Sequence, residues 1–491
     1  MNILITFTSL WCDAHAPDTG VRMLKKFSLL APLFALLLSG CSLAPDYQRP
    51  EMDIPQTWEA SQSQALQNKW WERFGDPTLN ALVDEALAGN KNVAQAMARV
   101  EQAQASLGVA RDALLPTGAA TADGSRTGTR RDAGTMYKKQ GSERFANSFS
   151  GALAASWNLD FWGKYWNAAE SARMGLVATE AARDNVLLSV AAGTVESYFW
   201  LSAYTWQEEL AQSVLKNREE SLKVYQNRFD NGQISDLDIL SIKANVETAR
   251  NALASARIAK NAAETSLAVL LGRSPAELLA GARIKAPGAL MASLASTPVL
   301  PSGIPSDILN MRPDIRQAEA SLKAANYNIG VARAAFLPSF SLTGLLGSAS
   351  IELNELLRSS NHYAALSGSI SLPLNFWTIK RGVTMVEAQK EEAVATYELT
   401  VLGAFKDVRD ALVSQTEYAN SVQALTRQVE YLDAAMGHAR TRYDNGFASY
   451  LELLTTESNL FSAQQALAAA HAQHLASIAK VCLALGGGWQ D

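Results

Sequence analysis

The segment RFDNGQIS at positions 228–235 returns as RYDNGFAS at positions 442–449, about 214 residues later. In each copy a glycine, Gly232 or Gly446, follows a long stretch without proline that has the composition of a helix. Glycine at such a place ends a helix, because it adopts the positive φ that closes the last turn. The repeated segment therefore predicts the same connection between two helices at two places in the chain.

The residues after each glycine predict the start of a second helix. Ser235 and Ser449 have the position of N-caps, and Asp238 and Glu452 follow three residues later. A serine followed at this spacing by an acidic residue forms a capping box, in which each side chain accepts a hydrogen bond from the other residue's backbone N–H. Each copy is thus expected to be the tip of an αα-hairpin that carries a carboxylate.

Three further pairs of segments follow the same order as the repeated turn, at offsets of about 214 to 222 residues. Matching segments in a constant order indicate an internal two-fold repeat with few insertions between its halves. We place the halves at residues 111–272 and 313–485. The pairs are ARDALLP (110–116) with ARAAFLP (332–338), NLDFW (158–162) with PLNFW (373–377), and LLG (270–272) with ALG (484–486).

Two segments in each half alternate between apolar and small polar residues, as strands do when their two faces meet different surroundings. The expected strands cover about 117–130 and 145–160 in the first half, and about 339–351 and 362–375 in the second. A membrane β-barrel with a wet interior has this pattern, and so does a soluble antiparallel sheet with one solvated face. The apolar positions are Phe145, Phe149, Leu153, Trp157, Leu159, Leu366, Ile370, Leu372 and Leu374, and opposite them lie Ser148, Ser150, Ala152, Ser156, Asn158, Ser367, Ser369 and Ser371.

Long helices are expected after each pair of strands. The stretches of about 167–229 and 381–443 contain no proline, and about 60 residues in one helix make a rod roughly 90 Å long. The return helices, at about 235–271 and 449–485, and a shorter helix at 313–336 carry apolar residues at spacings of three and four. This pattern is typical of a coiled-coil seam, which a single rod cannot bury, so the helices need neighbours. The first return seam comprises Ile239, Ile242, Val246, Ala249, Leu253, Ala256, Ala263, Leu267 and Leu270.

The N-terminal region has the form of an export signal. The run MLKKFSLLAPLFALLLSGC that begins at Met23 has two lysines and then about 12 apolar residues, too few to cross a bilayer. It ends in LSGC (38–41), which resembles a bacterial lipobox, so residues 1–40 are expected to be removed and Cys41 to carry lipid. Because residues 1–22 fit no signal peptide, we place the true start at Met23.

Composition and motifs argue against several classes of function. A net charge of −5 gives no sign of nucleic-acid binding, and 48% hydrophobic residues supply a large core. The chain lacks the HExxH, P-loop, GxSxG and CxxC patterns, so neither an enzyme activity nor a metal or other cofactor is expected. His471 and His474 lie three residues apart but have no acidic or cysteine partner nearby. Cys482 is expected to be a buried small hydrophobic residue.

Several segments match one known architecture. They are LSGCSLAPDYQRP (38–50), WWERFGDPTLNALVDEAL (70–87), PSGIPSDILNMRPDIRQAEA (301–320), ARAAFLPSFSLTGLLG (332–347) and LGGGW (485–489). With two strands and two long helices in each half, the chain resembles the TolC-like outer-membrane efflux proteins, in the lipoprotein branch of tripartite multidrug systems of the RND type. The resemblance covers nearly the whole mature chain.

The resemblance implies a mixed α/β membrane protein that works as a homotrimer. Each chain would give four strands to a twelve-stranded barrel in the outer membrane, continuous with a periplasmic barrel of long coiled-coil helices. A belt around the helices would come from residues 41–110, the connection 273–312 and the tail 486–491. Four strands cannot close a barrel, and an open edge cannot face lipid, so trimerisation has a physical reason.

As such a protein, the chain would be a passive exit duct for drugs and other toxic small molecules. It would lie in the lipid of the bacterial outer membrane, anchored by Cys41, and extend into the periplasm. A periplasmic adaptor would open it and an inner-membrane transporter would power it. Alternatively, the duct serves type I protein secretion or metal-ion export. In a different class, the chain is a periplasmic coiled-coil scaffold that conducts nothing, although a scaffold gives no reason for two strand pairs.

The resemblance also places functional residues at the hairpin tips, where the duct would close. Asp238 and Glu452 would line the aperture and favour cations, since three chains bring six carboxylates together. Alternatively they are helix caps alone. Arg228, Arg442 and Tyr443 are candidates for contacts that keep the aperture closed, or else they are ordinary helix-end residues. Adaptor docking is assigned to the turn residues Gly232, Gly446, Ser235 and Ser449.

One loop has an unusual charge. Residues 126–145 join the first two strands and would face the outside of the cell in a barrel. Four basic side chains there could pair with lipopolysaccharide phosphates, or the segment is an ordinary solvated loop. The basic residues are Arg130, Arg131, Lys138 and Lys139.

Overall fold

The computed structural model describes residues 42–53, 69–128, 145–281, 284–288 and 311–487 of the 491-residue chain. The predicted signal segment with Cys41 and the four basic residues of the first loop lie outside this part. The chain forms two compact units, each assembled from three stretches of sequence. The first comprises residues 1–45, 109–169 and 327–386, and the second comprises residues 46–108, 170–326 and 387–491.

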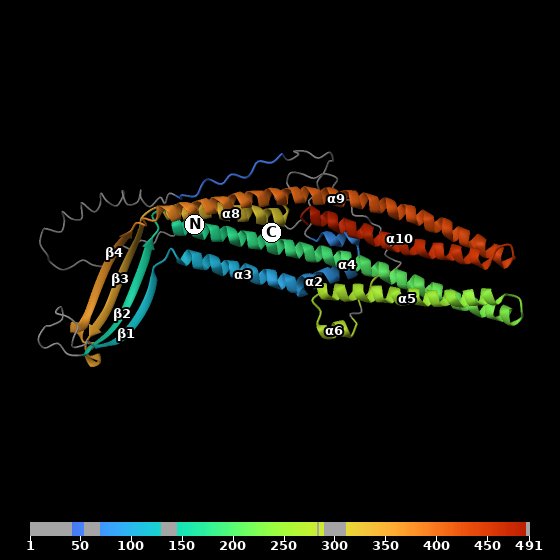
Figure 1. Ribbon diagram of the computed structural model, residues 1–491, viewed down its shortest axis with the longest axis horizontal. Coiled ribbons are helices and arrows are strands. Elements are labelled where there is room, and N and C mark those ends of the chain that lie inside the picture. The colour runs from blue at the N-terminus through green and yellow to red at the C-terminus, as the bar shows by residue number, and fades with distance from the viewer. Residues whose placement is uncertain (1–41, 54–68, 129–144, 282–283, 289–310, 488–491) are drawn as a thin grey trace. The chain divides into compact units, whose positions relative to one another are not determined.

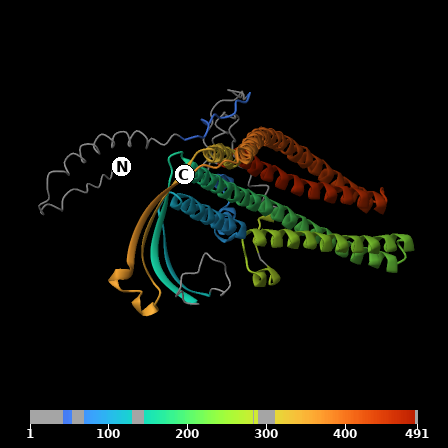
Figure 2. The ribbon, with the colours of Figure 1, turned by 60° about the vertical axis from the view of Figure 1, so that its left-hand side comes forward.

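Four strands of the first unit form one antiparallel sheet, in the order β1-β2-β3-β4 (Figure 2). β2 and β3 come from different halves of the chain and pair directly, with Leu153 opposite Leu346. Within the described residues, β1 and β4 are the edges of this sheet. The existence of all four predicted strands is confirmed. Their bounds are β1 (Thr117–Gly128), β2 (Phe145–Leu159), β3 (Ser339–Ser350) and β4 (His362–Ser371).

The register gives the sheet two chemically different faces. Directly opposed residues of neighbouring strands point to the same side, and Leu153 aligns with Leu346, which aligns with Ala364. The face of Leu153 carries large apolar side chains, and the other carries hydroxyls that bond across strands, as Ser341 and Ser369 do at 2.7 Å. The apolar face holds Phe145, Phe149, Trp157, Phe340, Leu342, Leu366 and Ile370; the polar face holds Thr121, Ser150, Ser156, Thr343, Ser367 and Ser371, with Leu345 and Tyr363 as larger members.

The last strand is shorter than predicted. β4 ends at Ser371 instead of about residue 375, so Leu372 and Leu374 do not belong to its apolar face. Pro373 explains the early end, because proline has no N–H to donate to a neighbouring strand. The next helix correspondingly begins at Phe376, earlier than predicted.

Helices make up most of the remaining described chain (Figure 1). α4 (Lys164–Asp230) and α5 (Asp236–Leu270) form one hairpin, and α9 (Phe376–Asp444) and α10 (Tyr450–Ala484) form another. α8 (Pro313–Ala334) precedes β3, two residues shorter than predicted. Both halves therefore contain two strands followed by two long helices, and an ancestral duplication stays a prediction. The other elements are η1 (Trp70–Phe74), α2 (Pro77–Gly89), α3 (Lys91–Asp112), α6 (Pro275–Leu279), η4 (Leu353–Glu355) and η5 (Ser359–Asn361).

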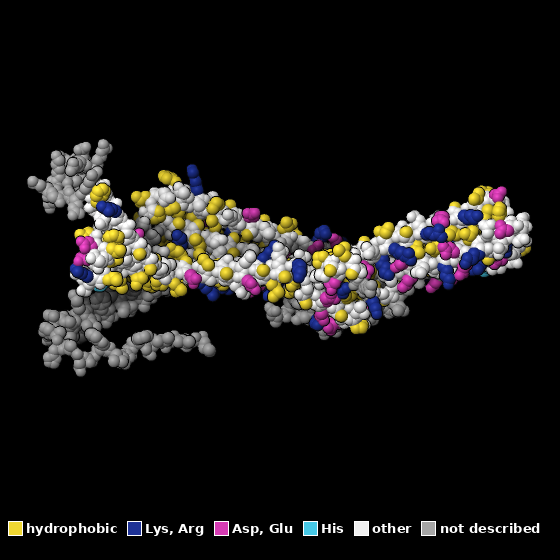
Figure 3. Space-filling view, turned by 90° about the horizontal axis from the view of Figure 1, so that it is seen from below, with side chains coloured by type: hydrophobic (Ala, Val, Ile, Leu, Met, Phe, Trp, Pro, Cys, Tyr) yellow, Lys and Arg dark blue, Asp and Glu magenta, His cyan; other side chains and the backbone are white. Residues whose placement is uncertain are grey.

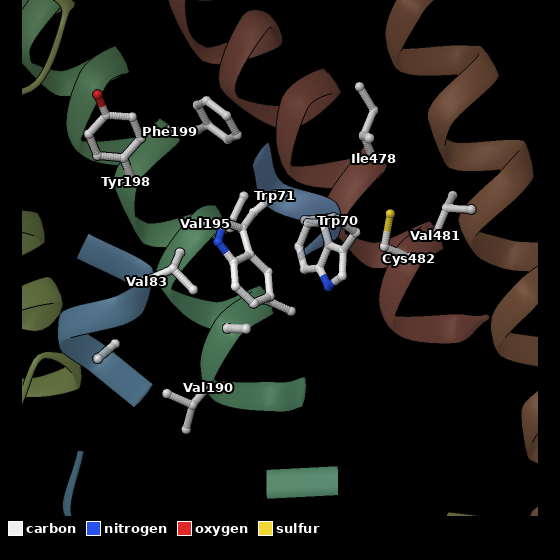
Figure 4. Close-up of a cluster of buried hydrophobic side chains, with 14 of the residues drawn as sticks. Trp70, Trp71, Val83, Val190, Val195, Tyr198, Phe199, Ile478, Val481 and Cys482 are labelled. Atoms are coloured by element: carbon white, nitrogen blue, oxygen red, sulfur yellow. The ribbon is translucent and has the colours of Figure 1, made fainter. Parts of the chain in front are cut away.

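The main core of the second unit surrounds the middle of α4 (Figure 4). η1 inserts Trp70, Trp71 and Phe74, all about 1% exposed, beside Tyr198 and Phe199 of α4. The rings of Trp70 and Trp71 meet edge to face at 5.7 Å, and those of Phe74 and Phe199 at 5.0 Å. Such edge-to-face pairs add about 0.5–1.5 kcal/mol each to the burial of their area. The short WWERF segment is therefore a central part of the core rather than a surface belt alone. Other residues of this core include Val83, Val190, Val195, Ile478, Val481 and Cys482.

Two residues in this core have strongly shifted pKa values. The hydroxyl of Tyr198 donates to the carboxylate of Asp76, the N-cap of α2, at 2.5 Å, and burial together with this hydrogen bond raises the pKa of Tyr198. Burial also raises the pKa of the Cys482 thiol to about 12. The prediction that Cys482 is a buried small hydrophobic residue is confirmed.

The apolar middle of α4 is a core segment. Its most hydrophobic 18-residue window is long and apolar enough to cross a bilayer, but 61% of that window is buried inside the protein. Helices in the centre of a large core are hydrophobic all round for the same reason. The predicted seam of α5 is likewise buried, at Ile239, Ile242, Val246, Ala249, Leu253, Ala256 and Leu267.

The segment that includes DYQRP is held against α8. Tyr47 and Arg49 both donate to the carboxylate of Glu319, from Oη at 3.2 Å and from Nη2 at 2.6 Å. Lys323, one turn farther along α8, lies 3.0 Å from the same carboxylate. Burial alone would raise the pKa of Glu319, but the hydrogen bonds from Arg49 and Lys323 outweigh it and lower the pKa. These contacts form an N-terminal clasp, defined by Tyr47, Arg49, Glu319 and Lys323.

Replacing Trp70 tests the main core. Trp70→Ala is expected to lower the free energy of unfolding by about 3–5 kcal/mol, because it leaves a cavity that the core fills only in part. Denaturant unfolding of the purified protein in detergent, followed by circular dichroism, measures this change. Trp377→Ala, at a side chain 82% exposed, is the matched control and is expected to stay within about 0.5 kcal/mol. Equal losses in the two variants contradict the assignment.

The N-terminal clasp is expected to depend on pH. Since folding lowers the pKa of Glu319 below its ordinary 4.5, the clasp contributes stability above that value and loses it as the pH falls through the folded-state pKa. Protection factors from hydrogen exchange of residues 46–53 should therefore be constant near neutral pH and fall below about pH 4. Glu319→Gln should lose this protection already at pH 7, and the exposed control Glu391→Gln should not. Retained protection in Glu319→Gln contradicts the clasp.

Candidate functional site

The two hairpin turns, which were predicted to be the functional ends, have the same backbone geometry. Gly232 and Gly446 have φ of +69° and +76°. In each turn the glycine N–H bonds to the carbonyl three residues back, and the next N–H to the carbonyl five residues back, at 2.8–3.0 Å. This is the Schellman arrangement that closes a helix. The prediction of a glycine with positive φ in each turn is confirmed.

The first turn contains the complete predicted capping box. The hydroxyl of Ser235 accepts from the N–H of Asp238 at 3.2 Å, and the Asp238 carboxylate accepts from the N–H of Ser235 at 3.3 Å. That carboxylate also accepts from the Ser235 hydroxyl at 2.7 Å. Asp238 therefore completes the capping box of α5, whose N-cap is Ser235, whether or not it has a second role.

The second turn differs from the prediction of a capping box. Ser449 caps α10 by accepting from the N–H of Glu452 at 3.3 Å, but the Glu452 carboxylate does not complete a capping box. It lies instead 3.3 Å from Nη1 of Arg442 at the end of α9. Glutamate is one methylene longer than the aspartate of the first turn, so its carboxylate reaches across to the arginine. The two predicted carboxylates thus have different local partners.

Three tyrosines join the two turns. Tyr225 of α4, Tyr443 of α9 and Tyr450 of α10 pack edge to face, with ring centroids 5.6–5.9 Å apart. Burial and a hydrogen bond with Tyr443 raise the pKa of Tyr225. Only Tyr443 was among the predicted site residues. The signal for the other two is their position, one turn before Arg228 and directly after Ser449, but no single-chain periodicity reveals that they meet.

We call this group the tip cluster. It comprises Leu222, Tyr225, Phe229, Ile234, Ile239, Ile242, Tyr443 and Tyr450. Because it draws side chains from both hairpins, the tip cluster holds their ends together. The predicted turns therefore form one site.

The two predicted arginines support this site from its rim. Arg228 lies over the ring of Tyr225 at 5.6 Å. Arg442 contacts Glu452 and also donates from Nη2 to the carbonyl of Phe447 at 3.3 Å. Arg442 and Glu452 are both about half exposed, so their pair contributes at most about 1 kcal/mol. Burial of the tyrosines is the larger stabilising term at the tips.

The outer surface of the tips is partly apolar. Leu237 and Leu240 of α5 and Phe447 and Leu451 beside the second turn are each more than 60% exposed. Basic and acidic side chains are interspersed along the helical part of the surface seen in Figure 3. Exposed apolar side chains that form a continuous patch with charge around it are typical of a protein-binding surface.

The predicted histidine pair lies elsewhere in the second unit. The ring of His471 on α10 lies 5.9 Å from that of Trp206 on α4, and burial lowers the pKa of both His471 and His474. Both rings are therefore packed within the helices as neutral groups at pH 7.

The outer membrane efflux protein family matches residues 82–273 and 304–487, most of the chain. The chain belongs to that family. Its members are transport proteins, so the prediction that this protein is not an enzyme is confirmed. The same match confirms the resemblance to outer-membrane efflux proteins that the sequence segments indicated.

Named relatives cover the chain almost from end to end. The cation efflux system protein CusC of Escherichia coli O6:H1 is 34% identical over 478 residues, which are 94% of this chain and 99% of CusC. The solvent efflux pump outer membrane protein SrpC of Pseudomonas putida is 33% identical over 479 residues, again 94% and 99%. Among solved structures, the CmeC outer membrane channel of Campylobacter jejuni is similar, with a TM-score of 0.83, 29% identity, and coverage of 92% of this chain and 96% of CmeC.

Removing one tyrosine ring tests the tip cluster. Tyr225→Ala is expected to destabilise the packing of the tips by about 3 kcal/mol, since a buried ring is lost from a small cluster. Hydrogen exchange of residues 222–242 should accelerate accordingly, while exchange around Tyr198 in the main core stays unchanged. Tyr225→Phe removes only the hydroxyl and should cost about 1 kcal/mol. Tyr431→Ala, at a side chain 72% exposed, is the control. If it accelerates exchange of residues 222–242 as much as Tyr225→Ala does, the role of the cluster is contradicted.

Proposed function

We propose that the protein is the outer-membrane exit duct of a tripartite efflux pump of the RND type. Three chains assemble into a passive channel that exports drugs and other toxic small molecules. A periplasmic adaptor opens the channel, and an inner-membrane transporter supplies the energy. The observation that carries this proposal is the four-stranded sheet with two unlike faces, in a chain of the outer membrane efflux protein family.

The sheet supports a barrel that is shared between chains. Its apolar face suits lipid, and its face of serine and threonine hydroxyls suits a water-filled interior. In the part of the chain that the structure describes, β1 and β4 have no strand partner on their outer edges, and unpaired backbone groups cannot face hydrocarbon. Pairing β1 of one chain with β4 of the next removes every edge, and three chains give twelve strands.

The hairpin tips support a periplasmic aperture. The tip cluster holds the two hairpins together, which corresponds to a closed state. Asp238 and Glu452 lie beside the turns, so that a trimer would gather six carboxylates around the mouth and favour cations. The exposed Leu237, Leu240, Phe447 and Leu451 and the turn residues Gly232, Ser235, Gly446 and Ser449 are the proposed docking surface of the adaptor.

The relatives support a passive duct whose cargo is chosen elsewhere. CusC is named for cations and SrpC for solvents, yet this chain is 34% and 33% identical to them over the same length. If the duct itself selected the cargo, this chain would be expected to be more similar to relatives that export one class of cargo than to relatives that export the other. We therefore assign selection to the inner-membrane transporter. The scaffold alternative leaves the apolar face of the sheet without a role.

Lipid on Cys41 is part of the proposal. The lipobox is followed at once by residues that bind to the folded protein. In the first unit the Ser42 hydroxyl donates to Oδ1 of Asn167 at 2.8 Å. In the second unit the N-terminal clasp holds Tyr47 and Arg49. A short, well-attached segment would keep the lipid close to the body of the protein, as an outer-membrane anchor requires.

Conductance in planar bilayers tests the duct and its aperture. The purified mature protein is expected to give small, cation-selective steps. Asp238→Ala combined with Glu452→Ala should enlarge the steps and reduce the preference for cations, because the carboxylates leave the mouth and Arg442 loses its partner.

The control removes two exposed carboxylates of α9 away from the turns, with Glu430→Ala and Asp433→Ala. It should leave conductance and selectivity unchanged. If the conductance steps of the wild type and the tip variant are identical, the two carboxylates act only in helix capping. Absence of conductance from folded trimers, even after addition of an adaptor, rejects the duct in favour of the scaffold.

A further inference from the structure

A polar group links three helices above the tip cluster. Arg218 of α4 donates from Nη1 to the carbonyl of Asn245 on α5 at 3.1 Å, and its Nε lies 3.5 Å from Oε2 of Glu457 on α10. The side chains of Arg218 and Glu457 are 10% and 22% exposed, so this is a largely buried ion pair. Arg218, Asn245 and Glu457 form what we call the polar node.

The polar node lies between two separate apolar clusters. On the tip side, the tip cluster contains Tyr225, Ile242 and Tyr450. On the far side, a separate small cluster contains Ala211 of α4 and Leu253 and Ala256 of α5, with Leu215 of α4 and Phe461 of α10 packed against it. Along each of the three helices the order is the same: tip cluster, node residue, second cluster.

The ion pair resists a small separation of the two hairpins. A buried pair adds little net stability, but a displacement too small to admit water leaves both charges buried without compensation. The edge-to-face tyrosine contacts on the tip side involve no full charge and tolerate such a displacement more easily. The node therefore limits small separations that the tip side allows.

The node also has room to adjust. The Nε of Arg218 is buried and makes no hydrogen bond within the described residues, since Glu457 is at the limit of bonding distance. A guanidinium has five N–H groups in a planar fork, so the carboxylate can move between Nε and Nη without losing the pair. A pair that tolerates a small shift but resists separation has the properties of a hinge.

We propose that the Arg218–Glu457 pair is the hinge of the aperture, and that it confines the separation of the tips to the helix ends beyond the polar node. Arg218 is thus a positioning residue that acts through the helices and touches no cargo. The inference deepens the proposed function, since it rests on tips that separate. Its test uses thiol labelling, which does not require conductance, so that the two can fail independently.

Two reporter cysteines compare the sides of the node in the full protein with Cys482→Ala. Ile242→Cys reports on the tip cluster and Ala211→Cys on the second cluster, both almost fully buried. In a Tyr443→Ala background, which loosens the tips, N-ethylmaleimide should modify Ile242→Cys at least tenfold faster and Ala211→Cys at the original rate. Adding Arg218→Met should accelerate Ala211→Cys at least tenfold as well.

Three further variants separate a hinge from a general loss of stability. The exchange Arg218→Glu with Glu457→Arg should restore slow labelling of Ala211→Cys. Arg250→Met, which removes an exposed ion pair between α4 and α5, should have no effect. Glu457→Gln keeps the shape of the side chain and replaces Arg218→Met if that variant does not fold. The hinge is rejected if neither Arg218→Met nor Glu457→Gln changes the labelling rate of Ala211→Cys, or if Arg250→Met raises that rate as much. It is also rejected if the charge exchange does not restore slow labelling.

Discussion

The burial of α4 by its neighbours is the constraint on which the second unit depends. Most of the stability of a helix in a protein comes from tertiary packing, and the apolar middle of the 67-residue α4 must be covered on every side. η1 and α2 from the N-terminal region, α5 from the same hairpin and α10 from the other half supply that cover. Because the elements come from all parts of the sequence, the core forms only when both halves are in place.

Away from this core the apolar packing is divided into smaller groups. The large core gives way to a cluster around Ala211, then to the polar node at Arg218, and finally to the tyrosines of the tip cluster. Both outer clusters are much smaller than the main core, so local opening costs less toward the turns than in the centre. A stable centre and a loosely held end are what a duct needs if one end opens while the rest stays assembled.

The sheet of the first unit imposes the second constraint, which acts between chains. Its large apolar and small hydroxyl-bearing faces require two different surroundings, and its two edges require partners. The described residues of a single chain meet neither requirement. The family to which the chain belongs and the proposed trimer agree with this physical demand.

The sequence by itself determined what depends on local chemistry. Gly232 and Gly446 determine the turns through their positive φ, and Ser235 and Ser449 determine where the next helices begin. The alternation of apolar and polar residues determines the strands. The structure confirms all three predictions. The end of β4 at Ser371, two residues before Pro373, also follows from local chemistry. Tertiary structure decided the rest. The Glu452 carboxylate pairs with Arg442 instead of completing a capping box. Tyr225, Tyr443 and Tyr450 meet only when the two hairpins pack together. The pairing of Arg218 with Glu457 is of the same kind, since no spacing along one helix specifies which side chain of another helix lies opposite.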